Sequence, residues 1–481
     1  MPMRSLNGFA MADHSAVSQG GRPPDDSVIV VDGDALERPG SPVPEGPQPV
    51  QKKVRSFDAP GTEGVMIIDE DLSGNLRRDA SSTQPVTDVP NLNFELVEEY
   101  PSWWKGRKSL NSSTINSFRC FVDRVLFFHD MVGLDKFLLK FRLKRGKTVD
   151  SSSAYRWISG AVKRGVKHLD FNISFDKFTL PDDLFTCRTL VTLKLDIGLV
   201  LNVPLDIHFP NLKTLHLKSV KLFDDNSVKS LFSNCSSLED VVIEKCSFKY
   251  VQSFSISHPW LKRLAIIHSC DSAHCWLVID TPYLSNFKYI GHVVAGYSLK
   301  KQESLVSADI QFLFEDKDLQ ADARHATSIF RQIYNVRSLV MSPYSLELLS
   351  SSEPLPAFPT LVELDIPYNK VEQLNSMDNG LEALLPHCPE LENLAFPQDV
   401  LNSLPEEVPS CLLFKVKVIE ISNFEYDQDC IRKAKYILEN GGALEKLTIL
   451  TSNIWHGYKL EISQVLFAYP RKSKECFILI V

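Results

Sequence analysis

A short leucine-containing phrase recurs along the chain and constrains its fold more than any other feature. The phrase is a leucine, two residues, an apolar residue, one residue and a second apolar residue. It occurs as LVTLKL at 190, LKTLHL at 212, LEDVVI at 238, LKRLAI at 261, LSNFKY at 284, LVELDI at 361 and LENLAF at 391. The first five lead leucines are 22, 26, 23 and 23 residues apart. A regular period of this length indicates one structural unit repeated along the chain.

Two other residue types accompany the phrase. Proline stands two residues before the lead leucine at Pro210, Pro259, Pro282, Pro359 and Pro389. Cysteine stands three residues before it at Cys187, Cys235 and Cys388. A proline at the entrance to a strand costs no ladder hydrogen bond and stops the preceding element. We interpret the cysteines as small buried hydrophobes. The phrase and its companions predict leucine-rich repeats.

The phrase also predicts the direction of its side chains. Alternate residues of a strand face opposite sides, so pairs such as Leu193 and Leu195 are expected in the core and their neighbours outside it. Stacked strands of this kind form a solenoid, which offers a long binding surface rather than a catalytic pocket. The residues predicted on that surface are Lys194, Asp196, His216, Lys218, Val242, Glu244, Arg263, Ile267 and Lys288.

Helices are expected between and after the repeats. In DDNSVKSLFSNC, Asp225 or Asn226 is predicted to cap a short helix buried through Val228, Leu231 and Phe232. The C-terminal part predicts a strand, a helix from about Gln428 that ends at Gly441 and Gly442, another strand, and a short helix at 462–468. The closing residues 476–481 are apolar on both faces, which predicts a strand covered on both sides.

Residues 1–88 have a different composition. They hold ten of the 28 prolines, only two aromatic residues, Phe9 and Phe57, and 14 acidic against 8 basic side chains. A segment with so little to bury cannot offset the entropy of ordering, so a flexible tail is expected.

Two apolar islands interrupt this tail, each followed at once by acidic residues. Such segments can add as a strand to the edge of a partner's sheet. They resemble SUMO-interacting motifs, although short aliphatic runs also arise by chance. The candidate SUMO-binding residues are Val28, Ile29, Val30 and Val31 in the first island and Val65, Met66, Ile67 and Ile68 in the second.

Charge and hydropathy narrow the classes of partner. The formal net charge of -8 gives no overall attraction to nucleic acid or to an anionic membrane, so protein partners are expected. No apolar run approaches the length of a membrane helix, and the N-terminus lacks the apolar segment of a secretory signal. These features predict a location in the cytoplasm or nucleus.

Three local clusters were weighed as functional sites. HSCDSAHC at 268–275 holds zinc-ligand residue types in an uncommon spacing, and we interpret it as a loop. FLLKFRLKRGK at 137–147 alternates basic and apolar residues, which predicts a strand with one solvent-exposed basic face. ENGGALEK lacks the ending of a phosphate loop. We predict no metal site, cofactor or catalytic residue, and a search for linear enzyme motifs finds none.

Several phrases together resemble the plant F-box/leucine-rich-repeat/FBD family. They are FRCFVDRVL at 118, AYRWISGAVKRGVKHLDF at 154, LPDDLFTCRTLVTLKLD at 180, PNLKTLHL, ENGGALEKLTI and YPRKSKEC. The resemblance implies an α/β fold: an irregular leucine-rich-repeat solenoid with a C-terminal α/β FBD-type domain and a disordered N-terminal tail. We expect a tail over 1–88, a linker with the first strand and helix elements over 89–150, repeats over 151–405 and the FBD-type domain over 406–481.

The resemblance also implies a function, and the sequence departs from the family pattern at one point. Its members resemble substrate receptors of cullin-RING ubiquitin ligases, in which the F-box docks a Skp-type adaptor and the repeats select a protein. Residues 89–94, VPNLNF, resemble the link that follows an F-box, but the leucine- and tryptophan-rich helices expected before it have no counterpart in residues 1–88. The hypotheses are therefore a ligase substrate receptor, or a non-ligase interaction or decoy protein whose tail binds SUMO.

Overall fold

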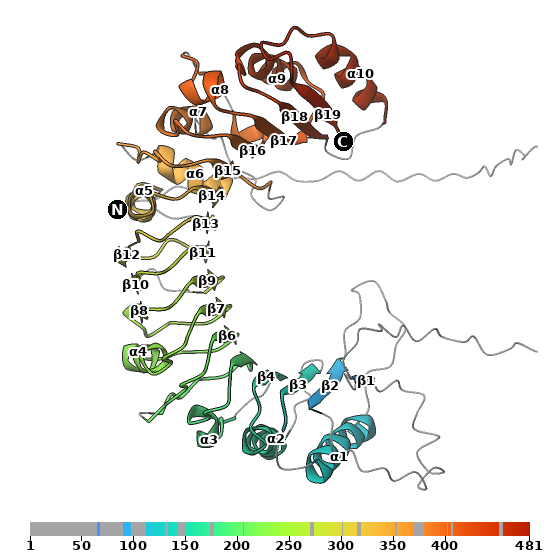
Figure 1. Ribbon diagram of the computed structural model, residues 1–481, viewed down its shortest axis with the longest axis vertical. Helices are drawn as coiled ribbons and strands as arrows, with labels where there is room; N and C mark the ends of the chain where they lie inside the picture. The colour runs from blue at the N-terminus through green and yellow to red at the C-terminus, as the bar shows by residue number, and fades with distance from the viewer. Residues whose placement is uncertain are drawn as a thin grey trace, which may run out of the picture. The chain divides into compact units, whose positions relative to one another are not determined.

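The computed structural model describes residues 65–67, 90–97, 112–129, 133–142, 150–173, 178–204, 206–269, 274–300, 302–314, 319–351, 354–368, 380–401, 403–405, 407–451 and 456–481. In these residues a 16-stranded sheet and a 3-stranded sheet are formed, and every paired strand runs parallel to its neighbour (Figure 1). The α/β repeat fold is confirmed.

The strands of the large sheet follow one another in chain order, apart from three that leave it. Its first half consists of β1 (Val65–Ile67), β2 (Asn91–Val97), β3 (Lys136–Arg142), β4 (His168–Ile173), β5 (Thr192–Asp196), β6 (Thr214–Lys218), β7 (Asp240–Glu244) and β9 (Arg263–Ile267). Its second half consists of β11 (Asn286–Gly291), β13 (Ser307–Phe312), β14 (Ser338–Met341), β15 (Glu363–Asp365), β16 (Asn393–Pro397), β17 (Val418–Phe424), β18 (Lys446–Thr451) and β19 (Phe477–Ile480).

Helices and short strands fill the connections. The helices are α1 (Ser112–Phe128), α2 (Ser151–Lys163), α3 (Asp182–Phe185), α4 (Asp225–Ser233), α5 (Leu319–Gln332), α6 (Pro343–Ser350), α7 (Leu381–Leu384), η2 (Leu385–His387), η3 (Gln398–Val400), α8 (Ser410–Phe414), α9 (Gln428–Asn440) and α10 (His456–Phe467). The 3-stranded sheet has the order β12 (Gly296–Lys300), β10 (Trp276–Asp280), β8 (Ser253–Ser257).

A tight turn leads into several of the repeats and ends at the lead leucine. The amide of Leu284 donates to the carbonyl of Thr281 at 3.1 Å, and the amide of Leu391 donates to that of Cys388 at 3.3 Å. A backbone hydrogen bond from the fourth residue to the first is typical of a β-turn. Proline suits the second position of such a turn because its φ is fixed. Pro282 and Pro389 occupy that position. The recurrent proline therefore shapes the turn as well as ending the preceding element.

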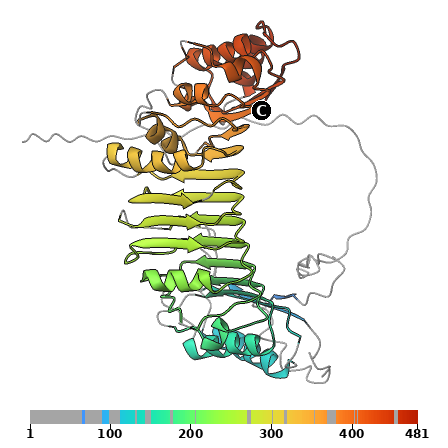
Figure 2. The same cartoon turned by 60° about the vertical axis from the view of Figure 1, so that its left-hand side comes forward.

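Hydrogen bonds after each turn join one repeat to the one before it. The amide of Lys213 donates to Val191, that of Glu239 to Lys213 and that of Lys262 to Glu239, each at 2.9 Å between nitrogen and oxygen. The same backbone position is thus bonded in successive repeats. This repetition fixes the register of the parallel strands (Figure 2).

The core contains the side chains that the repeat pattern assigns to it. The seven lead leucines are all 0% exposed: Leu190, Leu212, Leu238, Leu261, Leu284, Leu361 and Leu391. Leu193 and Leu195 are 2% exposed, so the inward half of the alternation is confirmed as well. Each such leucine contributes about 1.5–3 kcal/mol when buried from water.

The repeat cysteines are confirmed as buried residues. Cys235 and Cys388 are 0% exposed and Cys187 is 6% exposed. Cys235 donates its thiol proton to the Leu231 carbonyl at 3.0 Å. Burial raises the pKa of Cys235 to about 12, so this thiol is neutral at physiological pH.

The small back sheet was not predicted from the leucine phrase. Strand β8 buries Phe254 and Ile256, and β10 buries Leu277 and Ile279, each at 0% exposure. In Figure 1 the three strands β8, β10 and β12 lie on the same side of the large sheet as α4 and α5. Short strands thus replace helices in the central repeats.

The cap of α4 differs from the prediction. Asp224, rather than Asp225 or Asn226, is the N-cap, and its carboxylate accepts the Ser227 amide hydrogen at 2.7 Å. The capping residue must have an extended backbone, and Asp224 has φ -148° and ψ 153°. Asp225 instead accepts the amide of Gln252 at 2.9 Å.

The C-terminal elements follow the predicted order, with two differences. Helix α9 begins at Gln428 and ends before Gly441, whereas α10 already begins at His456. The prediction that the closing strand is covered on both sides is wrong, because Phe477 is 60% exposed. Strand β19 is the last of the sheet, and among the described residues none covers the side on which Phe477 lies.

Part of the second apolar island forms strand β1. Val65 lies opposite Asn93 and Ile67 opposite Glu95 in a parallel pairing with β2. Ile68 and the first island, 28–31, lie outside the described residues. Of the helices that the structure describes, none has the length and apolar character needed to span a membrane.

Gly442 gives a direct test of the packing after α9. A Cβ atom there would lie inside the van der Waals contact distance of the Leu413 carbonyl oxygen, which belongs to the backbone of α8. We expect Gly442→Ala to lower the free energy of unfolding by about 1–3 kcal/mol in urea titrations, because overpacking forces backbone shifts.

Gly160→Ala is the matched control. Gly160 lies inside α2 with its closest potential contact at 3.5 Å, so alanine is expected to be neutral or to stabilise by up to about 1 kcal/mol. An equal change in the free energy of unfolding for the two variants would contradict this account of the contact between Gly442 and α8.

Candidate functional site

The face of the large sheet opposite the helices carries the candidate binding residues. We call it the open face: it is formed by the first, third and fifth residues of strands β5, β6, β7 and β9 and their register partners in the other strands. In Figure 1 no described helix lies over this face between β4 and β13. The open face is therefore accessible within the described part of the chain.

The strand register aligns the third residues of the repeats into one row. We call this the middle row, and its members from β4 to β17 are Asp170, Lys194, His216, Val242, Ala265, Lys288, Asp309, Val340, Asp365, Ala395 and Glu420. Charged and polar residues make up most of the row, and the small apolar residues Val242, Ala265, Val340 and Ala395 are interspersed among them.

All nine residues predicted on the binding surface lie on the open face. Lys194, His216, Val242 and Lys288 belong to the middle row. Asp196, Lys218, Glu244 and Ile267 form a second row beside it, and Arg263 lies in a third row, opposite Asp240. The strands bring all nine together on adjacent repeats.

Ion pairs connect neighbouring strands across this face. Lys218 lies 2.6 Å from Glu244, and Lys288 lies 2.6 Å from Asp309, measured between ammonium nitrogen and carboxylate oxygen. Arg263 donates to Asp240 at 2.5 Å. Partly exposed pairs of this kind contribute at most about 1 kcal/mol each, so their main effect is to fix side-chain positions.

The ionisation of two face residues is altered by this setting. Burial lowers the pKa of His216, against the opposing effect of Glu244, and the charges of Lys194 and Lys218 lower it further. His216 is therefore neutral at physiological pH. Burial raises the pKa of Glu244, but the hydrogen bond and charge of Lys218 outweigh it and the net pKa is lowered. Glu244 is accordingly an anion that pairs with Lys218 at 2.6 Å and lies 3.8 Å from the ammonium group of Lys245.

A hollow lies on the open face over β7, β9, β11 and β13. Its volume is about 470 Å³, and its lining includes Val242 and Ala265 from the middle row. The pair of Arg263 and Asp240 borders it on one side, and Lys288 lies next to Ala265 in the middle row. Because alanine has the smallest side chain in this part of the row, the face is hollowed where charged groups surround an apolar floor.

Beyond the hollow the open face becomes acidic. Asp365 lies in the middle row between Val340 and Ala395. Burial raises its pKa, and the negative charges of Glu420 and Asp309 raise it further. Asp309 is neutralised by Lys288. Because Asp365 is exposed at the end of β15, solvent screens these charges and its ionisation costs the fold little.

Several residues that shape this site were not identified from the sequence. Asp240 holds the same position in LEDVVI as Arg263 holds in LKRLAI, so consistent counting within the phrase would have found it. Ala265 gives no functional signal in the sequence. Asp309 lies in a further copy of the phrase, LVSADI at 305, whose apolar position is a small alanine and is therefore harder to recognise.

The remaining sequence candidates lie elsewhere or are engaged. In the predicted basic strand, Lys140 pairs with Glu95 at 2.8 Å and Arg142 with Asp196 at 3.0 Å. In the described residues no group of three metal-ligating side chains is found, and Cys270 lies outside those residues. The described basic side chains of that strand are therefore engaged by carboxylates.

Comparison with known proteins decides the family. The model described as "FBD-associated F-box protein At5g56370, LRR repeats" matches residues 154–309, and the FBD model matches residues 404–449. An Arabidopsis thaliana protein named "F-box/LRR-repeat protein At4g14096" is 33% identical over 362 residues, which cover 69% of this chain and 75% of the relative. "Putative F-box/FBD/LRR-repeat protein At3g59240" from the same plant is 30% identical over 398 residues, with 76% and 77% covered.

The chain belongs to the plant F-box/LRR/FBD family. Within this F-box/LRR/FBD protein the matched repeat region runs from α2 into β13 and contains all nine predicted face residues and the hollow. The matched FBD region includes α8, β17 and α9. The family names describe interaction modules and point to binding rather than to catalysis.

Asp365→Asn tests the electrostatics of the open face. The raised pKa means that ionised Asp365 destabilises the folded chain above the ordinary carboxyl range, near pH 4. We expect the asparagine variant to be more stable at pH 7 by up to about 1 kcal/mol and equal to the parent once both states are protonated at low pH. Thermal unfolding between pH 3 and 8 measures this difference.

Glu244→Gln is the control with the opposite sign. The lowered pKa of Glu244 contributes stability above about pH 4, which is lost as the pH falls through the folded-state pKa. We expect the glutamine variant to be less stable at neutral pH. A loss of stability of the Asp365→Asn variant at pH 7 would contradict the raised pKa of Asp365.

Proposed function

We propose that the open face binds a target protein, with the hollow over β7–β13 as the centre of the contact. The observation that carries the proposal is the apolar floor of Val242 and Ala265 bordered by fixed charge pairs. Protein interfaces commonly place a desolvated apolar centre inside a polar rim. Ile267, in the neighbouring row, extends the apolar area.

The charge pattern favours a protein over nucleic acid. Phosphate contacts require cations that can exchange counterions for phosphate groups. On the open face, Lys140, Lys218 and Lys288 each lie within 2.8 Å of a carboxylate oxygen. A face with alternating signs instead suits a partner with complementary charges, which selects its orientation and excludes wrong partners.

We further propose that this binding serves substrate selection for an SCF-type ubiquitin ligase. The support is the family membership, because the relatives carry the F-box and the leucine-rich repeats in their names. Docking to a Skp-type adaptor belongs to this proposal and depends on a segment that the repeats do not supply. Without such docking, the same open face would make the chain a non-ligase or decoy binder.

Ala265→Arg tests the open face. An arginine at this position fills the hollow and adds an unpaired charge, so we expect capture of partner proteins from plant extract to fall at least about 10-fold, equivalent to roughly 1.4 kcal/mol. Quantitative mass spectrometry of the captured proteins gives the measurement.

Ser255→Arg is the matched control. Ser255 is the third residue of β8 in the back sheet and is half-buried, as is Ala265 in β9. Proteins bound through the open face are expected to remain with this variant. A set of captured proteins that is the same for both variants would contradict the proposal.

The second candidate function is SUMO binding by the two apolar islands. The supporting observation is that Val65–Ile67 has an extended backbone and pairs with a sheet edge, as a strand-adding motif must. We propose that this segment adds in the same manner to the edge of a SUMO sheet, with its acidic neighbours facing a basic rim.

Alanine replacement of residues 28–31 and 65–68 tests this second function. We expect the titration shifts on isotope-labelled SUMO to disappear, since the islands supply the apolar contacts of the added strand. Replacing one island at a time assigns the share of each. Shifts that persist after both replacements would exclude the islands as the SUMO contact.

A further inference from the structure

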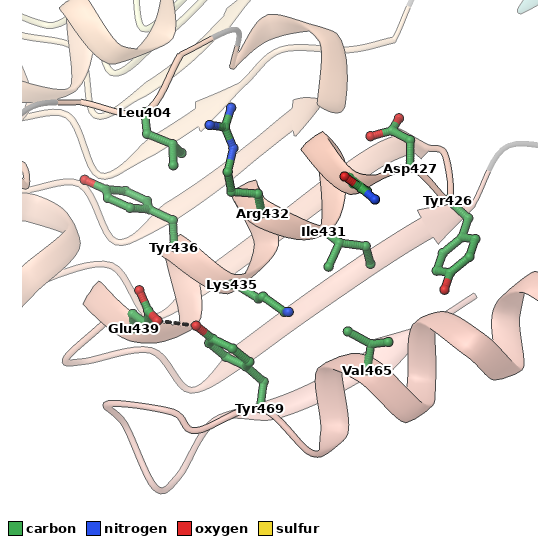
Figure 3. Close-up of a pocket in the computed structure, with 11 residues that line it drawn as sticks. Leu404, Tyr426, Asp427, Ile431, Arg432, Lys435, Tyr436, Glu439, Val465 and Tyr469 are labelled. Atoms are coloured by element: carbon green, nitrogen blue, oxygen red, sulfur yellow. Dashed lines mark hydrogen bonds between the residues drawn. The ribbon is translucent and has the colours of Figure 1, made fainter.

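A cleft in the C-terminal part of the chain offers a second binding site, separate from the open face. It has a volume of about 640 Å³ and is lined by α9, by Tyr426 before it, by Val465 of α10 and by Tyr469 after α10 (Figure 3). From Gln428 to Glu439 the lining spans eleven residue steps of α9, or about 16 Å. That length matches about five extended residues of a peptide.

Helix α9 has two stripes of side chains with different surroundings. Cys430, Ala434 and Ile437 are buried in the core. Ile431 and Lys435, one turn apart, line the cleft instead. A surface helix normally presents a polar outer face. Ile431 is apolar and only half-buried against the core, so part of its side chain is available to a partner.

The apolar part of the cleft lies between the two helices. Figure 3 shows Ile431 and Val465 facing each other across the cleft, with the ring of Tyr426 at one end and that of Tyr469 at the other. Aromatic rings of this kind supply large contact areas in binding sites. The space between them suits one aromatic or aliphatic side chain.

The carboxylates of the cleft are already engaged within the chain. Asp427 caps α9 by accepting the amide hydrogen of Cys430 at 2.8 Å. Glu439 accepts the hydroxyl hydrogen of Tyr469, which raises the pKa of that tyrosine. Asp429, just outside the cleft, is held by Arg432 at 2.5 Å and by Lys433 at 2.7 Å.

Lys435 differs from these residues. Its ammonium group lies 4.9 Å from the centre of the Tyr469 ring, a cation–π contact. In the described part of the chain, no carboxylate forms an ion pair with it, whereas Arg432 and Lys433 share Asp429. An ammonium group has three donors, so Lys435 retains the capacity to bind an incoming carboxylate.

We propose that this cleft binds a short acidic segment of a partner protein, in which a carboxylate pairs with Lys435 and an adjacent aromatic or aliphatic side chain enters between Ile431 and Val465. The proposal is independent of the open face, which uses other strands and other residues. It assigns to the C-terminal part of the chain, from Leu404 to Tyr469, a recognition site of its own.

The test pans a random dodecapeptide library displayed on phage against the immobilised full-length chain. Enriched peptides are expected to share Asp or Glu next to an aromatic or large aliphatic residue. Their affinities, measured by fluorescence anisotropy, are expected to fall at least 10-fold with Lys435→Glu and about 5-fold with Ile431→Ser. Replacing the peptide carboxylate by its amide is expected to have an effect similar to Lys435→Glu.

Lys474→Glu is the matched control. Lys474 is an exposed lysine of the same C-terminal part, and it lines neither the cleft nor the hollow on the open face. The peptides are expected to bind this variant as they bind the parent, and circular dichroism confirms that each variant is folded. Enrichment of basic peptides, no enrichment, or equal loss with Lys474→Glu would overturn the proposal. Self-association of the chain that Ile431→Ser abolishes would overturn it in favour of a second copy as the occupant.

Discussion

The parallel register of the repeat strands is the constraint on which the rest of the structure depends. A lead leucine without exposed surface precedes seven of the strands, and a hydrogen bond from the residue that follows it holds the chain to the previous repeat. A shift by one residue would turn every outward side chain into the core. Because the register repeats, residues some 23 positions apart in sequence become direct neighbours, as Val242 and Ala265 are.

The chemistry of the open face follows from that register. Lys218 reaches Glu244 and Lys288 reaches Asp309 because the register places each pair side by side on adjacent strands of the same row. These pairs contribute little stability, but they hold charged groups at fixed positions around a hollow floored by Ala265. The binding proposals for the open face and for the α9–α10 cleft both rest on the same argument. In each, a small apolar area is bordered by charged groups, which are ion pairs around the hollow and Lys435 beside the Tyr469 ring in the cleft.

Much of the architecture was predictable because periodic patterns report local geometry. The lead leucines, the buried cysteines, the start of α9 and the orientation of all nine face residues followed from spacing alone. The back sheet did not, since β8, β10 and β12 have the same length as the repeat strands but lie outside the leucine phrase. The exposure of Phe477 was missed because alternation cannot tell a central strand from the last one. Neither could spacing reveal the hollow, which depends on the small size of Ala265 between larger neighbours.

Lysine footprinting of the complex tests the central claim most directly. The full-length chain is acetylated with and without a purified partner, and the rate at each lysine is followed by mass spectrometry. The account predicts slower modification of Lys194, Lys218 and Lys288 on the open face. Lys229 of α4 and Lys300 of the back strand β12 are expected to react at unchanged rates. Protection of Lys229 and Lys300 with no change at the three open-face lysines would place the partner on the covered side and contradict the account.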